Sequence, residues 1–295
     1  MRTTAAVIGR SLMAFYDDQM THHAAALTYY ALMSLFPAVL LALSLLGLLG
    51  QYPETYNAIV DYLRETAPAS VVDPLDRSLR QTFQNEGTAA TALVISVPVA
   101  LYGTTGALEA ARRALNVVFE LEQPGRGFVK RKAIDIGSTF VLMALVLVSL
   151  IMVFVGGRFA EDMLGFVGLG ETAAQVWSYA RWPGAILVAM LVFSYVYYVT
   201  PDIKQRAFHW VTPGAAVGVL LWLLASWAFS AYIRNVADVG AIYGAFAGAI
   251  VLVAWLWISN VALLFGAELN AEIERQKQLS AGVPRGETLN RPARS

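Results

Sequence analysis

Two carboxylates of this sequence have positions that could support chemistry. Glu109 follows the apolar stretch 88–108 by one residue, and Glu268 follows the stretch 244–266 by two residues. If a helix starts at Gly244, a rise of ~1.5 Å per residue places Glu268 ~36 Å along it, at the inner headgroup level of a bilayer. We expect Glu268 to pair there with Arg112 or Arg113 as a structural clamp. A proton or substrate site is the second interpretation, because a carboxylate deeper in a membrane would indicate function more strongly.

Hydroxyl groups and internal prolines form the second group of candidates. Tyr29 and Ser34 lie in the stretch 24–50 and could line a cavity for an amphipathic substrate, although a hydroxyl that bonds its own helix is the default. Pro37, in the same stretch, frees a backbone carbonyl that needs another partner or a water-lined cavity. A plain kink is the more frequent meaning of such a proline. The substrate-pathway candidates are Tyr29, Ser34, Pro37, Tyr243 and Glu268.

Residue types that perform catalysis are scarce. The chain has no cysteine and three histidines, which excludes thiol catalysis and cysteine-ligated metal. It contains no glycine-rich phosphate loop, no G-x-S-x-G and no H-E-x-x-H motif. The sequence therefore predicts no catalytic residue, no metal site, no cofactor and no enzymatic activity.

Small residues mark positions where helices can approach closely. Gly214 and Gly218 have the GxxxG spacing, and so do Gly244 and Gly248. Lipid tails give helices no hydrophobic reason to associate, so close packing of small residues does part of that work in membranes. We predict packing within the fold, and a homo-oligomer contact is the second interpretation.

The elements that must hold these residues are six long apolar stretches. With 57% hydrophobic and 14% charged residues and a mean hydropathy of +0.56, the chain is far more apolar than a soluble domain. Each stretch is near the ~20 residues that a helix needs to cross a bilayer. We predict an all-α membrane protein with six transmembrane helices, over 24–50, 88–108, 137–156, 183–199, 210–232 and 244–266. Pro183 and Pro213 suit the first turns of the fourth and fifth spans.

Basic residues near span ends predict the orientation. Most of the 21 lysines and arginines fall on one side of the implied bilayer if the N-terminus is inside, so we expect both termini in the cytoplasm. The second connection holds the densest group, which is expected to face anionic lipid headgroups. Nucleic acid is not an expected partner, because glutamates interleave with this group, whose members are Arg112, Arg113, Arg126, Lys130, Arg131 and Lys132.

The remaining segments complete a single membrane domain over residues 1–279. Residues 5–20 have the spacing of an amphipathic helix lying on the inner leaflet. The connection 51–87 has helical periodicity on both sides of Pro68, and either caps the outer face of the helices or is solvated at the surface. Residues 280–295 are expected to be a disordered cytoplasmic tail.

Three motifs carry a resemblance to a known family. The first motif runs from His23 to Pro37 (HAAALTYYALMSLFP), and the second runs from Phe208 to Ala215 (FHWVTPGA). The third combines Tyr243 to Ala247 with Trp255 and with Gly266 to Asn270 (GAELN). Together these motifs resemble the YihY/BrkB family of bacterial inner-membrane proteins. A serine commonly follows the Tyr-Gly pair in that family, whereas this chain has Ala245, which weakens a chemical role for a hydroxyl there. The resemblance implies a six-helix inner-membrane fold and an activity that is poorly defined. Members were once labelled as a ribonuclease, and others are associated with serum resistance or envelope lipid traffic.

These observations favour one function and leave two alternatives. A transporter- or flippase-like protein that handles an amphipathic envelope molecule is the first hypothesis. A non-transporting membrane scaffold that supports envelope integrity is the second. A membrane-associated ribonuclease is the third, and the residues argue against it, because RNA hydrolysis needs metal-binding carboxylates or an acid–base pair in a water-exposed cleft.

Overall fold

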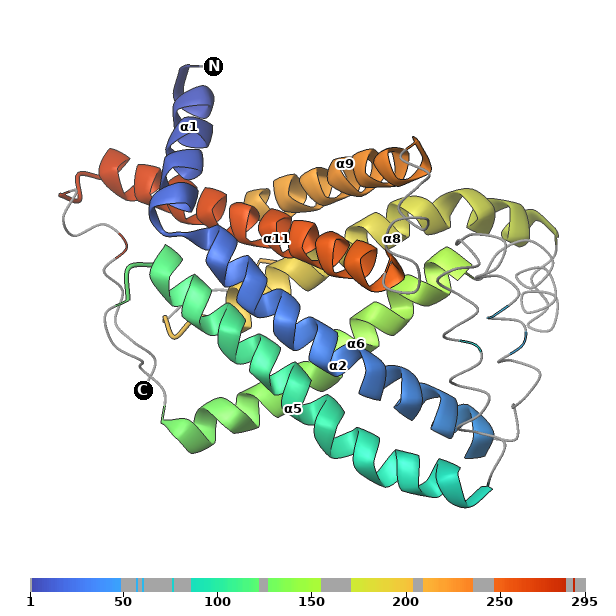
Figure 1. Cartoon of the computed structure of the whole chain (residues 1–295). Coiled ribbons are helices and arrows are strands. Elements are labelled where there is room, and N and C mark those ends of the chain that lie inside the picture. Colours follow the sequence, from blue (N-terminus) through green and yellow to red (C-terminus); the bar gives the residue numbers. More distant parts are fainter. Residues whose placement is uncertain are drawn as a thin grey trace. The chain divides into compact units, whose positions relative to one another are not determined.

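The described part of the chain is built from seven α-helices (Figure 1). The computed structural model describes residues 2–48, 86–121, 127–154, 171–203, 209–235 and 247–284, with the single residues Asn57, Val60, Asp76 and Leu289. The helices are α1 (Arg2–Asp17), α2 (Met20–Leu48), α5 (Glu86–Val118), α6 (Phe128–Phe154), α8 (Glu171–Val199), α9 (Pro213–Asn235) and α11 (Ala247–Ser280). The prediction that the protein is all-helical is confirmed for these residues.

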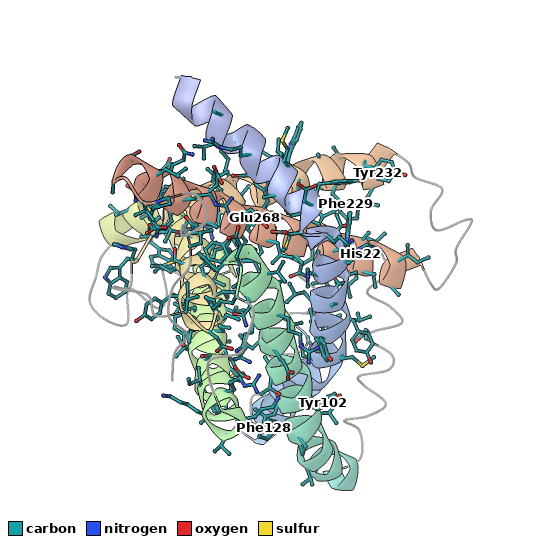
Figure 2. All side chains as sticks on the ribbon, turned by 90° about the vertical axis from the view of Figure 1, so that its left-hand side faces the viewer. His22, Tyr102, Phe128, Phe229, Tyr232 and Glu268 are labelled. Atoms are coloured by element: carbon teal, nitrogen blue, oxygen red, sulfur yellow. The ribbon has the colours of Figure 1, made fainter. Side chains whose placement is uncertain are left out.

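Four of these helices are long and apolar enough to cross a membrane, within Phe128–Ser149, Gln175–Val199, Pro213–Ile233 and Gly248–Ser280. Large apolar side chains project from outer faces of the helices, as Tyr102, Phe128 and Tyr232 show (Figure 2). Apolar exposure on this scale is typical of a surface that faces lipid rather than water.

Several boundaries differ from those predicted from hydropathy. α5 continues to Val118, ten residues beyond the predicted end at Leu108. Leu108, Leu115 and Val118 are buried and recur at helical spacing, so one apolar face carries the helix past the point where charged residues begin. α8 begins at Glu171, so the prediction that Pro183 opens this helix is wrong, and Pro183 lies inside it. Pro213 does begin α9, as predicted.

Other predicted segments are described only in part. α1 covers most of the segment expected to be an amphipathic helix, while its place at a membrane interface stays a prediction. α11 ends at Ser280, which is the first residue of the predicted tail. Most of the predicted outer cap at 51–87 and most of the predicted tail at 280–295 lie outside the described residues.

The chain forms two compact units. Unit 1 comprises Met1–His23, Ala111–Leu223 and Val261–Ser295, and unit 2 comprises Ala24–Ala110 and Leu224–Asn260. α5, α9 and α11 each contribute residues to both units. The single-domain prediction for residues 1–279 is not tested by this division.

In unit 2, α2 runs beside α5 (Figure 1). A Cβ added at Gly103 would lie 2.8 Å from the Cα of Ser34, and one at Gly106 would overlap the ring of Tyr30. Glycine is needed at Gly103 because the α2 backbone lies too close for a side chain, and at Gly106 because the Tyr30 ring occupies the space that a side chain would fill. Asn260 of α11 donates a hydrogen bond from Nδ2 to Thr28 Oγ1 at 3.1 Å, which links α11 to α2.

In unit 1, α6 packs against α8. Tyr195 donates its hydroxyl to Ser138 Oγ at 3.2 Å, and Arg181 Nη1 donates to the Val153 carbonyl at 3.4 Å. Fully buried Leu115, Leu264 and Val219, from α5, α11 and α9, form part of the core of the same unit. This unit also contains the candidate site.

Candidate functional site

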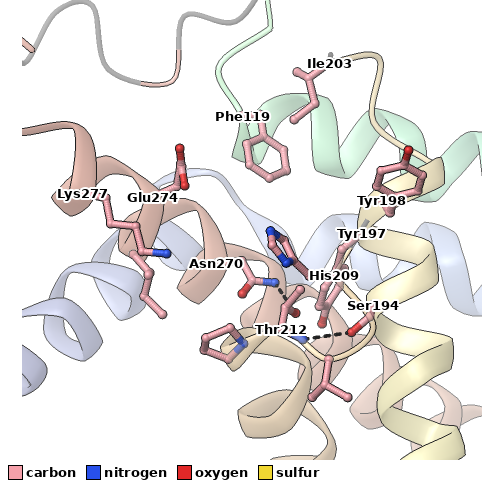
Figure 3. Close-up of a pocket in the computed structure, with 13 residues that line it drawn as sticks. Phe119, Ser194, Tyr197, Tyr198, Ile203, His209, Thr212, Asn270, Glu274 and Lys277 are labelled. Carbon is pink, nitrogen blue, oxygen red and sulfur yellow. Dashed lines mark hydrogen bonds between the residues drawn. The ribbon is translucent and has the colours of Figure 1, made fainter. Parts of the chain in front are cut away.

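A pocket of about 380 Å³ lies in unit 1 where the ends of several helices meet (Figure 3). The C-terminal end of α8, the start of α9 and the later half of α11 form most of it, and the segment just after α5 completes it. Its walls combine aromatic and aliphatic side chains with polar and charged ones. The lining residues are Phe119, Ser194, Tyr197, Tyr198, Ile203, His209, Val211, Thr212, Pro213, Asn270, Ile273, Glu274 and Lys277.

The start of α9 is fixed by a side-chain network with Asn270 at its centre. Asn270 Oδ1 accepts a hydrogen bond from the Gly214 N–H at 2.8 Å, and Asn270 Nδ2 donates to Thr212 Oγ1 at 2.9 Å. Thr212 Oγ1 also accepts from the Ala215 N–H at 3.1 Å, so Thr212 caps the helix, and Pro213 occupies the first helical position. The amides at this helix terminus are therefore satisfied by side chains from α11 and from the cap itself.

The end of α8 is tied into the same network. Ser194 Oγ accepts a hydrogen bond from the Thr212 N–H at 3.2 Å, and both this bond and the Asn270–Thr212 bond are drawn in Figure 3. Tyr197 donates its hydroxyl to the Leu263 carbonyl of α11 at 2.6 Å. Because the Tyr197 hydroxyl is bonded to a neighbouring helix, the aromatic ring of Tyr197 is held in place as part of the pocket wall.

Close backbone contact between α9 and α11 brings these side chains together. A Cβ added at Gly214 would overlap the carbonyl oxygen of Gly266, and one added at Gly266 would lie 2.5 Å from the Gly214 carbonyl oxygen. A Cβ at Gly218 would lie 3.1 Å from the Ala262 carbonyl oxygen. Gly214 and Gly218 thus face α11 inside unit 1. Gly248 lies in the first turn of α11, and Gly244 lies outside the described residues.

Charged and polar residues occupy the edge of the pocket. Lys277 and His209 are exposed, and Glu274 accepts a hydrogen bond from Gln278 Nε2 at 3.2 Å. An apolar wall with a few polar groups is the usual composition of a small-molecule site, and a volume of about 380 Å³ is within the ordinary range. The pocket can therefore take a ligand that has an apolar part and a polar part.

A second group of ionisable residues lies on another face of α11. Glu268 is 2% exposed, is labelled in Figure 2, and shares a hydrogen bond with Asp18, which lies between α1 and α2. Glu272 is paired with Arg10 at 2.7 Å and with Arg275 at 3.0 Å. Two carboxyl groups can share a hydrogen bond only when one of them is protonated, so the contact between Asp18 and Glu268 is expected to depend on pH.

The expected pairing of Glu268 with Arg112 is wrong. Arg112 is bound to Asp135 of α6, with Nη1 3.3 Å from Asp135 Oδ2 and a second, shorter contact from Nη2, and its Nε lies 3.8 Å from Asp202 Oδ1. All three side chains are buried. A buried arginine is held by the carboxylates nearest in space, and the sequence does not show that α6 and the end of α8 deliver them.

Burial of Asp18 gives the first prediction, a pH dependence of stability. Burial raises the pKa of Asp18 above its ordinary 3.8, and Glu120 and Asp17 add to the rise, while the hydrogen bond with Glu268 and the charge of Arg275 oppose it. A carboxyl whose pKa is raised by folding favours the folded state at low pH, and this contribution is lost as the pH rises through the raised pKa. We expect thermal unfolding in detergent to show stability falling as the pH rises from about 4, and Asp18→Asn to flatten this dependence.

Asp17→Asn is the matched control, because Asp17 is the exposed neighbour of Asp18. The control variant should keep most of the slope of the wild type, because the charge of Asp17 is the smallest of the causes that raise the pKa of Asp18. Parallel pH curves for Asp18→Asn and wild type would show that the shared proton does not contribute to stability.

The other predicted pathway residues do not line the pocket. Tyr29 is 56% exposed on α2, with its ring 5.3 Å from that of Tyr30. Ser34 donates its hydroxyl to the Ala31 carbonyl of its own helix at 2.9 Å, the default considered from the sequence. The backbone of Pro37 lies in α2 and its side chain is not described, and Tyr243 lies outside the described residues.

Sequence reasoning missed the residues that form the pocket. Thr212 and Asn270 lie in the second and third motifs that carry the family resemblance, and they meet here through a hydrogen bond across 58 positions of sequence. Polar residues inside two separated motifs were the available signal. Nothing in either motif alone indicates which residue of the other it contacts.

Exposed apolar helix faces, together with four described helices that are long and apolar enough to cross a bilayer, are typical of the membrane protein class. Residues 12–288 match the virulence factor BrkB family, and the chain is a member of that family. YfkH of Bacillus subtilis (strain 168), named as ribonuclease-like, is 31% identical over 258 residues, which cover 86% of this chain and 90% of YfkH. The UPF0761 membrane proteins XCC0860 of Xanthomonas campestris and XAC0937 of Xanthomonas axonopodis are each 25% identical, over 91% and 86% of this chain.

The chain spans only 61% and 58% of the lengths of these two Xanthomonas relatives. No solved structure matches the chain.

Proposed function

We propose that this protein crosses the bacterial cytoplasmic membrane six times, with both termini in the cytoplasm, and that it binds and moves an amphipathic envelope molecule through the pocket of unit 1. The six long helices α2, α5, α6, α8, α9 and α11 correspond to the six apolar stretches of the sequence and support the six spans. The positive-inside distribution of lysine and arginine supports the orientation.

The observation that carries the proposal is the mixed chemistry of the pocket. Phe119, Tyr198 and Ile273 provide an apolar wall, while His209 and Lys277 provide polar groups at its edge. An amphipathic molecule needs both kinds of surface within one site. The aromatic and aliphatic wall suits a hydrocarbon chain, and the charged edge suits a headgroup.

A pocket-filling variant tests this function. Ile273→Trp adds bulk to the pocket wall, and forcing an occupant against a larger side chain costs about 1–3 kcal/mol. We therefore expect purified protein in liposomes to move fluorescently labelled envelope lipids faster than empty vesicles do, and Ile273→Trp to slow this movement by about tenfold.

Leu220→Trp is the matched control, since Leu220 is 55% exposed on α9 and does not line the pocket. This variant should move lipid as the wild type does. No movement above empty vesicles across several lipid classes would contradict the transport function, and equal loss in both variants would contradict the assignment of the pocket.

Two alternatives are tested by the same preparation. A membrane scaffold would recruit partners or anionic lipid without moving lipid, and crosslinking that returns only the protein itself would count against it. The ribonuclease-like name of YfkH makes RNA hydrolysis the third candidate. A nuclease function requires that purified protein degrades RNA and that this activity is lost in Glu109→Gln or Glu268→Gln.

A further inference from the structure

The pocket contains one ammonium group and one imidazole ring that the described part of the chain leaves without partners. Arg10, Arg112 and Arg275 of unit 1 are each paired with carboxylates. The Lys277 ammonium and the His209 ring, in contrast, make no hydrogen bond or ion pair with any residue that the structure describes. Lys277 lies one turn beyond Ile273 on the α11 face that lines the pocket, so its charge is adjacent to the apolar wall.

The neighbouring helix end adds to the attraction for a negative group. α9 starts at the pocket, and its first turn contains no acidic residue, so the positive end of its dipole is not neutralised within that turn. The N–H groups of Thr212, Gly214 and Ala215 are already bonded to side chains. Direct contacts to an anion must therefore come from side chains, while the helix dipole contributes only its field.

From this arrangement we infer that the ligand of the pocket carries a phosphate-type anionic headgroup, bound by Lys277 with His209 beside it, while its apolar part lies against Phe119, Tyr198 and Ile273. Lysine is a point-charge binder of phosphate. Glu274 lies at the same edge, and its Oε1 accepts a hydrogen bond from Gln278 Nε2 at 3.2 Å. This inference rests on the proposed function and names the chemical class of its substrate.

A pair of ligands that differ only in the phosphate gives the sharpest test. Dihexanoyl phosphatidic acid and dihexanoylglycerol share their acyl chains, and binding of each to the full chain in a nonionic detergent can be measured by titration calorimetry. One lysine near a phosphate changes affinity by about fivefold. We expect the wild type to bind phosphatidic acid at least fivefold more tightly than dihexanoylglycerol, and Lys277→Gln to remove most of this difference while leaving dihexanoylglycerol binding unchanged.

Charge-preserving and charge-removing controls separate a specific site from general surface attraction. Lys277→Arg should keep the preference for phosphatidic acid. Lys130→Gln removes a cation from α6 that does not line the pocket, and it should also keep the preference. A loss in Lys130→Gln as large as that in Lys277→Gln, or equal affinities of the wild type for the two ligands, would overturn the inference.

Inorganic phosphate alone is the third ligand, since the same side chains could bind a free phosphate. Binding of inorganic phosphate that depends on Lys277 and is as tight as that of phosphatidic acid would overturn the assignment to a lipid headgroup. Weak or undetectable binding would support it. Failure of the proposed function has a different signature, in which neither amphiphile binds and Ile273→Trp changes nothing.

Discussion

Replacing Arg112 with methionine should lower the free energy of unfolding by about 3–5 kcal/mol, because it leaves buried carboxylates without their cation. Arg112 is 3% exposed, and its partners Asp135 and Asp202 are 2% and 0% exposed. Thermal or denaturant unfolding in detergent, followed by circular dichroism, measures the change. The variant is expected to be among the least stable single substitutions in unit 1, since a buried charge that loses its partner is one of the costliest changes in a protein.

Two further variants test the cause of this loss. Arg113→Met removes the same charge from an exposed neighbouring position and should change stability by no more than about 0.5 kcal/mol. Adding Asp135→Asn to Arg112→Met should recover part of the loss, because one of the two carboxylates is then neutral. An Arg112→Met variant as stable as the wild type would show that the ion pair with Asp135 does not hold α5 to α6.

Alanine at Gly214 or Gly266 should separate α9 from α11 and cost about 1–3 kcal/mol or more. A Cβ at Gly214 would lie 2.6 Å from Asn270 Oδ1 and would overlap the Gly266 carbonyl, and a Cβ at Gly266 would lie 2.5 Å from the Tyr197 hydroxyl. The obstructing groups include backbone atoms, which cannot rotate away as a flexible side chain can. The same variants should lose ligand binding, because Asn270 can no longer cap α9 at the pocket. Unfolding in detergent and binding of phosphatidic acid measure the two effects.

Gly137→Ala is the matched control for these two substitutions. Gly137 lies inside α6, and an added Cβ there would meet no atom within 4 Å. Since alanine is a better helix former than glycine, this variant should be as stable as the wild type or more stable by up to about 1 kcal/mol. If Gly214→Ala and Gly266→Ala were as stable as Gly137→Ala, close packing of α9 against α11 would not limit the residue size at these positions.

Hydropathy predicted the helices better than it predicted their ends. The apolar stretch 210–232 corresponds closely to α9, because Pro213 and the cap at Thr212 start that helix at the edge of the apolar run. α5 and α8 extend well beyond their apolar stretches. A helix can continue into polar sequence wherever one of its faces stays buried, and an average over all faces of a window does not detect this.

Glycine spacing and polar motifs indicated part of the site. The GxxxG spacing identified Gly214 and Gly218 as small residues on one face of α9, and the structure places them against Gly266 and Ala262 of α11. Gly214 contacts Gly266, which lies far away in the sequence, so the GxxxG spacing did not indicate this partner. Polar residues in the apolar stretches were also weak indicators, since Ser34 bonds its own helix whereas Asn270 organises the start of another.

By itself, the sequence determined the solvent of this protein and its helical class. When lipid surrounds a long apolar segment, its backbone N–H and C=O groups find hydrogen-bond partners only within a helix. The helical structure of each segment therefore does not depend on which other helices pack against it. Only the tertiary structure decided which charges are paired and where the pocket lies, because Arg112, Asp135 and Asp202 come from three separate segments, as do Ser194, Thr212 and Asn270. Contacts between distant segments depend on how the helices pack, and the residue pattern of one segment does not show which other segment it contacts.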